Sequence, residues 1–224
     1  MTGPVIGVVS EYEPSQLALE AVNRAGGQPW VVSSLNCDIS KALGKVGALF
    51  YPHSQEVTPE DLTESSILAS EVGLMRAALD ADMPVYAIGR GFQVLNVALG
   101  GSVAEVAEDH HSDNDDGEER SKYHHIYISP GSKLAAVVGS GGFVRANSRH
   151  RYGAREAQKS GLLLASAYGR DDGVIEALES PRHRWVIGVQ FRPELRLEIP
   201  PHFDRLMQSL VERAAERLHA TKAP

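Results

Sequence analysis

The chain has 224 residues, of which 42% are hydrophobic and 23% are charged. This composition is ordinary for a protein that buries a sizeable core, and the length favours one α/β domain over two very small ones. The 29 acidic and 22 basic side chains leave a formal charge of −7, which argues against nucleic acid or an anionic membrane surface as the main partner.

The N-terminal residues MTGPVIGVVS carry no basic segment before their apolar run, so they predict a first strand and not a signal peptide. No stretch reaches the roughly 18 uninterrupted apolar residues of a membrane span. The single cysteine, Cys37, excludes an intrachain disulfide and suits a reducing compartment, so we expect a cytoplasmic protein. Cys37 itself is expected to be a small, half-buried side chain.

Strand-like and helix-like segments alternate along the chain. Short apolar and β-branched runs predict strands at Val5–Val9, Gln28–Ser33, Ala48–Tyr51, Met83–Ile88, Ile126–Ile128, Phe143–Arg145, Leu162–Tyr168, Val174–Leu178 and Trp185–Gln190. Helical spacing predicts helices at Gln16–Ala25, Thr63–Asp80, Phe92–Leu99 and Pro201–Leu218. The alternation predicts a three-layer α/β/α fold with a mostly parallel central sheet, and the strand-rich second half predicts a small antiparallel portion.

We expect a single domain over residues 1–224, with two segments outside its core. Residues 107–122 hold a run of Asp and Glu with few apolar side chains, which predicts an exposed acidic loop. Residues 219–224 are expected to fray as a tail.

Two histidine pairs flank the acidic run, His110-His111 and His124-His125. Such pairs beside acidic residues invite a metal-binding interpretation. Adjacent histidines on a loop have no defined ligand geometry, however, so a solvated loop is the preferred interpretation. The sequence therefore predicts no metal site and no cofactor.

The segment PVYAIGRGFQVLNVALGG, residues 84–101, joins a buried strand to a helix through a tight turn. This is the layout of a nucleophile elbow, in which a Ser or Cys at the turn attacks a carbonyl carbon. The backbone amide of the next residue helps to bind the oxyanion that forms. Here the turn residue is Gly89, which has no side chain to attack with.

This segment resembles the signature GICRG-hydrophobic-Q-LLNVALGG of gamma-glutamyl-gamma-aminobutyrate hydrolases and related class I glutamine amidotransferases. The residues that match are Arg90, Gly91, Gln93, Asn96, Ala98, Leu99, Gly100 and Gly101. The resemblance implies the flavodoxin-like fold of class I glutamine amidotransferases. It also places the nucleophilic cysteine of the family at Gly89.

Three further segments resemble motifs of the same family, in the same order. GALFYPHSQEVTP, residues 47–59, is similar to GLLLPGGGDVDP, whose glycines supply an oxyanion-hole amide. NSRH, residues 147–150, resembles the NS-x-HHQ substrate segment. Residues 172–194 resemble DGVIEAIE…VLGVQWHPE, which ends in the catalytic His and Glu. The resemblance covers nearly the whole chain, and the acidic loop around residues 109–119 is the part without a clear counterpart.

The residues that carry out the reaction in this family are replaced here. Gly89 stands for the nucleophile, and Arg192 stands for the catalytic histidine, which leaves Glu194 without an imidazole to orient. The glycines of PGGG have become His53, Ser54 and Gln55. The second His and the Gln of NS-x-HHQ have become Arg151 and Tyr152.

Each replacement removes something that the family's reaction requires. Without a thiolate no acyl-enzyme forms, and an arginine that stays protonated cannot accept a proton. Glycine at the elbow also relieves about 1–3 kcal/mol of backbone strain. The sequence therefore predicts a catalytically inactive homologue, a pseudoenzyme of gamma-glutamyl-gamma-aminobutyrate hydrolase or a class I glutamine amidotransferase.

By this alignment a vestigial pocket is lined by His53, Ser54, Gln55, Arg90, Gln93, Asn147, Ser148, His150 and Arg151. Arg192 and the other basic side chains would make the pocket cationic, which favours a ligand that carries a carboxylate or a phosphate. The preferred alternative is that Arg192 pairs with Glu194, or with acidic side chains on the surface, and fills an unused cavity.

Three classes of function stay open. The preferred one is a binding protein for a small anionic ligand or for a protein partner, including a second copy of the chain. The second is a hydrolase of gamma-glutamyl or related amides without a cysteine, with Ser54 or Ser148 as nucleophile and His53 or His150 as base. Neither serine has the strained-turn context of a serine hydrolase. The third is a subunit whose site a partner chain completes.

Overall fold

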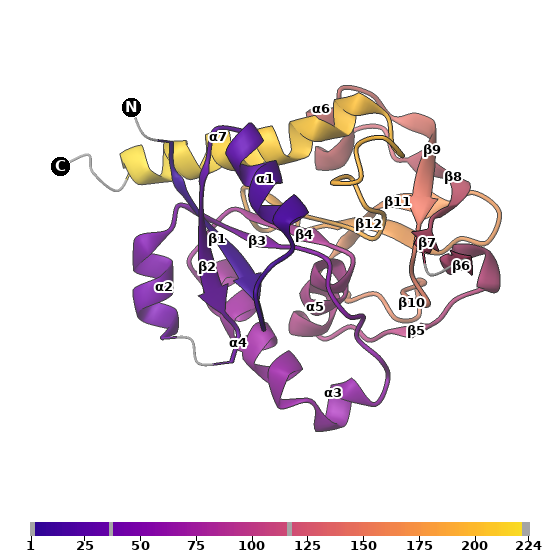
Figure 1. Cartoon of the computed structure of the whole chain (residues 1–224), viewed down its shortest axis with the longest axis horizontal. Coiled ribbons are helices and arrows are strands. Elements are labelled where there is room, and N and C mark those ends of the chain that lie inside the picture. The colour runs from indigo at the N-terminus through magenta and orange to yellow at the C-terminus, as the bar shows by residue number, and fades with distance from the viewer. Residues whose placement is uncertain (1–2, 36–37, 116–117, 221–224) are drawn as a thin grey trace.

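The computed structural model describes residues 3–35, 38–115 and 118–220, so Cys37 and residues 221–224 of the expected tail lie outside the described residues. A 9-stranded sheet with the order β2-β1-β3-β4-β13-β12-β11-β8-β9 forms the centre of the described part (Figure 1). Its parallel strands are β1 (Val5–Ser10), β2 (Gln28–Ser33), β3 (Ala48–Tyr51), β4 (Val85–Ile88) and β13 (Val186–Val189).

The second half of the chain extends this sheet with antiparallel strands, as the sequence predicts. These strands are β12 (Ile175–Glu179), β11 (Leu164–Gly169), β8 (Lys122–Ile128) and β9 (Gly142–Ser148). Two short strand pairs lie outside the main sheet, β5 (Ala104–Glu105) with β10 (Tyr152–Gly153), and β6 (Asp113–Asp115) with β7 (Glu118–Arg120). β1, β3, β4 and β13 lie inside the sheet and are almost wholly buried, which explains their continuous apolar runs.

Helices cover both faces of the sheet and form two apolar cores. One face packs against α1 (Gln16–Arg24), α6 (Lys133–Val138), the 3₁₀ helix η2 (Pro201–Phe203) and α7 (Asp204–Ala220). The other packs against α2 (Ile39–Lys45), α4 (Ser66–Asp80) and α5 (Arg90–Ala98). In Figure 1, α7 runs along the upper side of the sheet and α4 and α5 lie below it. The three-layer α/β/α prediction is confirmed.

The helices α2 and α6 do not appear among the predicted elements. Both are short, so their apolar periodicity is weak, but each begins at a side-chain cap. Asp38 accepts a hydrogen bond from Lys41 N at 3.0 Å, and Ser132 accepts one from Ala135 N at 3.0 Å. The predicted helix Thr63–Asp80 is divided at Ser65, whose hydroxyl caps α4, so that α3 (Asp61–Glu64) is a separate turn.

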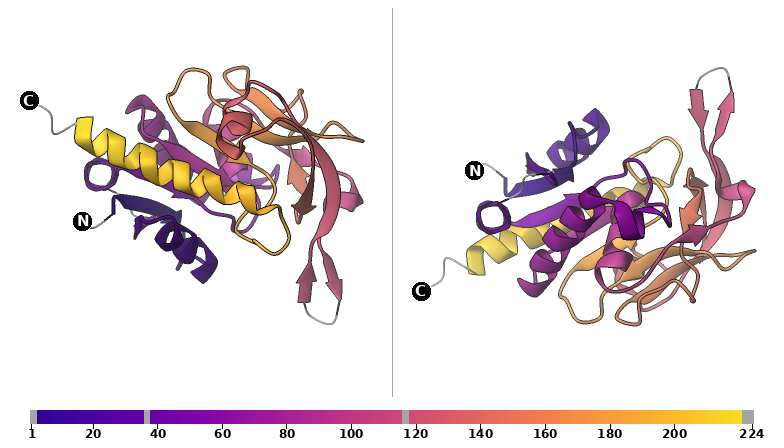
Figure 2. Two further views of the ribbon diagram at one scale, coloured as in Figure 1. Left: turned by 90° about the horizontal axis from the view of Figure 1, so that it is seen from above. Right: turned by 90° about the horizontal axis from the view of Figure 1, so that it is seen from below.

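The prediction of an exposed acidic loop over residues 107–122 is wrong in part. Its first residues form the 3₁₀ helix η1 (Glu108–His110), and β6 and β7 pair as a hairpin that projects from the end of the sheet (Figure 2). A charge-rich composition does not prevent backbone pairing in a solvated hairpin. The tail also begins later than expected, because residues 219 and 220 still belong to α7. None of the described helices is long and apolar enough to cross a membrane.

Candidate functional site

The turn between β4 and α5 has the backbone of a nucleophile elbow. Gly89 has φ 53° and ψ −106°, a conformation that is strained for any residue with a Cβ. Its N–H donates to Val189 O at 2.9 Å. A Cβ on Gly91 would lie 2.5 Å from Tyr51 O, so glycine there lets α5 pack closely against β3. The elbow is therefore built as the sequence predicts, with no side chain at its apex.

His53 occupies the space into which a side chain at the elbow would extend. A Cβ built on Gly89 would overlap His53 Nδ1 and lie 3.0 Å from Cγ of the same ring. Within the described residues, His53 Nδ1 has no hydrogen-bonding partner. Burial lowers the pKa of His53 to about 3, and the positive charge of Arg192 adds to the effect. The imidazole is therefore uncharged at neutral pH and fills the space above Gly89.

In the segment that resembles the catalytic His-Pro-Glu motif, two side chains form an ion pair with each other. Arg192 Nε donates to Glu194 Oε1 in a largely buried ion pair, with the two side chains 12% and 5% exposed. Asn147 supports this segment, because its Oδ1 accepts from Arg192 N at 2.9 Å and its Nδ2 donates to Arg192 O at 3.1 Å. The predicted pairing of Arg192 with Glu194 is confirmed. Glu194 therefore offsets part of the positive charge of Arg192.

Two residues assigned to the pocket from the alignment hold the scaffold instead. Arg90 forms a buried ion pair with Glu71 of α4 at 2.7 Å and donates to Gln55 O at 2.8 Å. Gln93 is 0% exposed. Its Oε1 accepts a hydrogen bond from Val57 N, and its Nε2 donates one to Tyr152 O. The expectation that Arg90 adds positive charge to the pocket is wrong, because its guanidinium is already satisfied by a buried carboxylate.

A cavity of about 280 Å³ includes in its wall His53, the residue that lies against the elbow glycine. Of the predicted pocket residues, it is lined by His53, Ser54, Gln55, His150 and Arg151. Arg149 and Glu119 also line it and pair with each other at 3.1 Å. Arg90, Gln93, Asn147 and Ser148 are not part of its wall.

Glu56 is a site residue that the sequence analysis does not identify. It lines the same cavity, and its carboxylate accepts from Arg151 N at 2.8 Å and from Tyr152 N at 3.2 Å. Gln93 Nε2 donates to it at 3.1 Å. One glutamate in a loop gives no sequence signal of this kind, because its partners are distant in the chain.

Ser148 does not present its hydroxyl to the cavity. The side chain is 0% exposed, and its hydroxyl donates to His110 O at 2.8 Å. His110 Nδ1 is 3.4 Å from Ser148 Oγ, and His110 Nε2 is 2.7 Å from Asp172 Oδ2, an order that resembles a Ser-His-Asp triad. The serine proton is directed to a backbone carbonyl, and no substrate carbonyl can approach a fully buried Oγ. Ser148 is therefore a poor candidate for a nucleophile.

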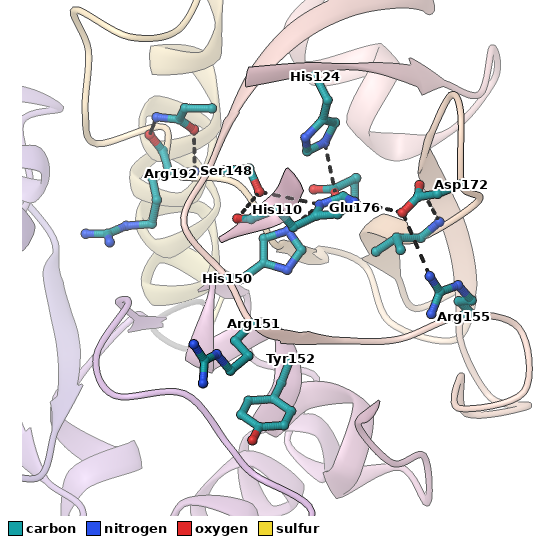
Figure 3. A network of polar contacts seen from close by, with 12 residues as sticks. His110, His124, Ser148, His150, Arg151, Tyr152, Arg155, Asp172, Glu176 and Arg192 are labelled. Carbon is teal, nitrogen blue, oxygen red and sulfur yellow. Dashed lines mark hydrogen bonds and ion pairs between the residues drawn. The ribbon is translucent and has the colours of Figure 1, made fainter. Parts of the chain in front are cut away.

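A second group of polar side chains, the Glu176 cluster, consists of Glu176, His110, His124 and His150 (Figure 3). Glu176 is 0% exposed, and His110 and His150 are each 2% exposed. The expectation of a solvated loop is therefore wrong for His110, which turns inward because Asp172 and Glu176 lie beside its ring. His110, His124 and Glu176 each offer one metal-ligating atom, and these atoms lie within 4.8 Å of one another.

The electrostatics of the Glu176 cluster favour an ionised carboxylate. Burial raises the pKa of Glu176, but His124 and His150 outweigh burial and hold this pKa well below its ordinary value. Burial lowers the pKa of His124, but Glu176 reverses the effect and the net pKa is raised. Burial and His150 lower the pKa of His110. The cluster thus combines one anionic oxygen with a poorly protonated imidazole at His110.

We expect His53 to make the protein less stable in acid. Its folded-state pKa of about 3 lies below the ordinary 6.5, so below pH 6.5 the unfolded chain binds a proton that the folded chain does not. The free energy of unfolding should therefore fall as pH falls, with a contribution from the half-buried His53 of less than about 1 kcal/mol per pH unit. Urea unfolding between pH 7 and pH 5 should show a shallower dependence for His53→Asn than for wild type. A matched His125→Asn change at an exposed position should not alter it, and equal slopes for all three proteins would contradict this account.

Two relatives match this chain in sequence over most of their length. A Schizosaccharomyces pombe protein provisionally named as a glutamine amidotransferase is 30% identical over 228 residues, covering 96% of this chain and 88% of its own. The gamma-glutamyl-gamma-aminobutyrate hydrolase of Escherichia coli K12 is 28% identical over 226 residues, covering 87% of each chain.

Solved structures share the fold at low sequence identity. The glutaminase domain of Trypanosoma brucei CTPS, solved with bound acivicin, superposes with a TM-score of 0.71 at 19% identity, covering 95% of this chain and 94% of that one. The architecture is thus that of class I glutamine amidotransferases. The sequence profile of Peptidase C26 matches residues 4–194. This match agrees with the elbow and with the relatives above, and the chain therefore belongs to the Peptidase C26 family.

Proposed function

We propose that this chain is a Peptidase C26 protein that has lost the family's cysteine chemistry and binds a small molecule in the cavity over the elbow. The observation that carries the proposal is the contact between Gly89 and the His53 ring, which leaves no room for a nucleophilic side chain. The Arg192–Glu194 ion pair supports it, because the position of the catalytic base is held by a guanidinium. Loss of both nucleophile and base removes the covalent route to hydrolysis.

The ligand proposed here carries a carboxylate. The cavity is lined by residues with polar side chains, among which Arg151 is exposed, whereas Arg149 is already paired with Glu119 and Glu198. Arg151 is then the cavity cation with the greatest freedom to turn toward a ligand. Calorimetry with glutamate and gamma-glutamyl-gamma-aminobutyrate should detect binding that Arg151→Ala weakens.

The test of lost catalysis is a reconstruction of the family's catalytic residues. Wild type and the triple variant His53→Gly/Gly89→Cys/Arg192→His are compared for release of ammonia from glutamine and of γ-aminobutyrate from its gamma-glutamyl amide. We expect no turnover above background by wild type and measurable turnover by the triple variant. The control is the same triple variant with Gly89→Ala, which restores space and base but lacks a thiol. Turnover by wild type, or equal rates for the Cys and Ala variants, contradicts the proposal.

A second candidate function is amide hydrolysis without a cysteine. It is favoured by the Escherichia coli relative, which is named as a hydrolase, and by the exposed Ser54 in the cavity wall beside His53. This candidate predicts turnover by wild type that Ser54→Ala abolishes. The same substrates and product assays therefore decide between the two functions.

A further inference from the structure

Three atoms of the Glu176 cluster form a nearly equilateral triangle. His110 Nδ1 lies 3.2 Å from His150 Nε2, and Glu176 Oε1 lies 3.5 Å from the first and 3.4 Å from the second. His124 Nε2 lies 3.2 Å from the same oxygen. An ion bound tetrahedrally at about 2.0–2.1 Å separates its ligand atoms by about 3.3 Å. The triangle therefore has the dimensions of one face of such a coordination sphere.

His110 Nδ1 and His150 Nε2 are within hydrogen-bonding distance of each other, but several other polar atoms of this cluster have no hydrogen-bonding partner. In the described part of the chain, neither carboxylate oxygen of Glu176 meets hydrogen-bonding geometry, and the same holds for both ring nitrogens of His124 and for His150 Nδ1. Glu176 is 0% exposed, so bulk water does not solvate its charge. Buried polar groups without partners are uncommon and costly. A cation between Glu176 Oε1 and the surrounding nitrogens would satisfy several of these atoms at once.

The side chains around the cluster already orient His110 as a ligand. His110 Nε2 is 2.7 Å from Asp172 Oδ2, so Nε2 carries the proton and donates it to this carboxylate. The Nδ1 lone pair is then directed toward His150 and Glu176. Asp172 is itself fixed, because its Oδ1 accepts from Val174 N at 3.1 Å. A carboxylate behind a ligating histidine is the usual outer partner in protein zinc sites.

The donor set selects the kind of metal. Imidazole nitrogens with one carboxylate oxygen suit Zn²⁺ and its neighbours among the transition metals, whereas Mg²⁺ and Ca²⁺ require oxygen ligands. The ligands come from four segments, η1, β8, the turn after β9, and β12. An ion there would join these segments under the β6–β7 hairpin, and it would fix His150 at the wall of the cavity.

We propose that the Glu176 cluster is a structural zinc site, with His110 Nδ1, His150 Nε2 and Glu176 Oε1 as ligands and His124 completing the coordination. The site is separate from the elbow and does not depend on the proposed loss of catalysis. This proposal differs from the solvated-loop interpretation of the two histidine pairs, because the two members of each pair have different roles. One member of each pair, His110 and His124, binds the metal, and the other, His111 and His125, does not.

Metal content and zinc titration of the purified full-length chain test the site. After removal of metal by chelation and dialysis, wild type should bind one Zn²⁺ per chain. Glu176→Gln and His110→Ala should each weaken binding by about 100-fold or more, and Asp172→Asn by about 10–100-fold. His125→Ala is the matched control, since His125 neighbours His124 on the same strand but is exposed. The zinc affinity of this variant should equal that of wild type. Absence of zinc binding by wild type, or equal loss in His125→Ala and Glu176→Gln, overturns the proposal.

A measurement on wild type keeps the proposal testable if the variants fail to fold. X-ray absorption at the zinc edge should show about four nitrogen or oxygen ligands at about 2.0–2.1 Å with the outer-shell scattering of imidazole. Zinc should also raise the melting temperature of the metal-free protein, because an ion that binds the folded state stabilises it. A spectrum without imidazole scattering, or a melting temperature that zinc leaves unchanged, overturns the proposal.

Discussion

Gly89→Cys is expected to lower the free energy of unfolding by about 2–6 kcal/mol, and His53→Gly is expected to remove a large part of that loss. Two effects add at this position. The backbone conformation, with φ 53°, costs a side chain about 1–3 kcal/mol, and overpacking against the half-buried ring of His53 costs about 1–3 kcal/mol more. The overlap is with the ring of His53, so removal of the ring should relieve the second effect and leave the first.

Urea unfolding of wild type, both single variants and the double variant measures this coupling directly. We expect an interaction free energy of at least about 1 kcal/mol in favour of the double variant. Gly100→Cys is the matched control, because Gly100 has φ +93° but a Cβ there meets nothing within 4 Å, so it reports backbone strain alone. If Gly89→Cys costs no more than Gly100→Cys, His53 does not block the elbow. The reconstruction of catalysis would then need no change at His53.

Glu71→Leu is expected to lower the free energy of unfolding by about 3–5 kcal/mol, because it leaves the guanidinium of Arg90 buried without a counter-ion. The two side chains are 10% and 7% exposed, and Arg90 Nη2 donates to Glu71 Oε2 at 2.7 Å. Arg90 is the first residue of α5, and Glu71 lies on α4, so the pair fixes the start of the elbow helix. Burial raises the pKa of Glu71 in spite of Arg90, which agrees with a site that excludes water.

The control for this prediction is an ion pair of the same length on the surface. Arg213 and Glu216 of α7 are also 2.7 Å apart, with side chains 44% and 61% exposed. Glu216→Leu should cost less than about 1 kcal/mol, because exposed ion pairs contribute little. The double variant Glu71→Leu/Arg90→Leu should recover much of the stability lost in Glu71→Leu. If urea unfolding gives equal losses of unfolding free energy for Glu71→Leu and Glu216→Leu, burial does not determine how much an ion pair contributes to stability.

Several elements of the fold could be predicted because their signals are local. The strands β3 and β4 appear in the sequence as short apolar runs, and the elbow appears as a strand, a glycine and a helix in direct succession. The helices α2 and α6 were missed because they have 7 and 6 residues, too few for a periodic apolar pattern to stand out. Their capping residues, Asp38 and Ser132, were the available signal.

The glycine at the elbow and the arginine two residues before Glu194 can also be located from the order of motifs along the chain. In the structure Gly89 lies at the elbow and Arg192 pairs with Glu194, whereas Arg90 and Gln93 hold the scaffold and do not line the cavity. Whether a basic side chain faces a cavity or a buried carboxylate depends on its packing partner. Glu71 is on another helix, and no spacing in the sequence joins it to Arg90.

By itself, then, the sequence determined the α/β alternation, the elbow without a nucleophile and the absence of a histidine before Glu194. These features are matters of residue identity and short-range periodicity, which a linear chain displays directly. The tertiary structure alone decided that His53 fills the space above Gly89 and that His110, His124 and His150 meet at Glu176. Such contacts join segments far apart in the chain, and burial, which removes water as a competing partner, is a property of the folded state.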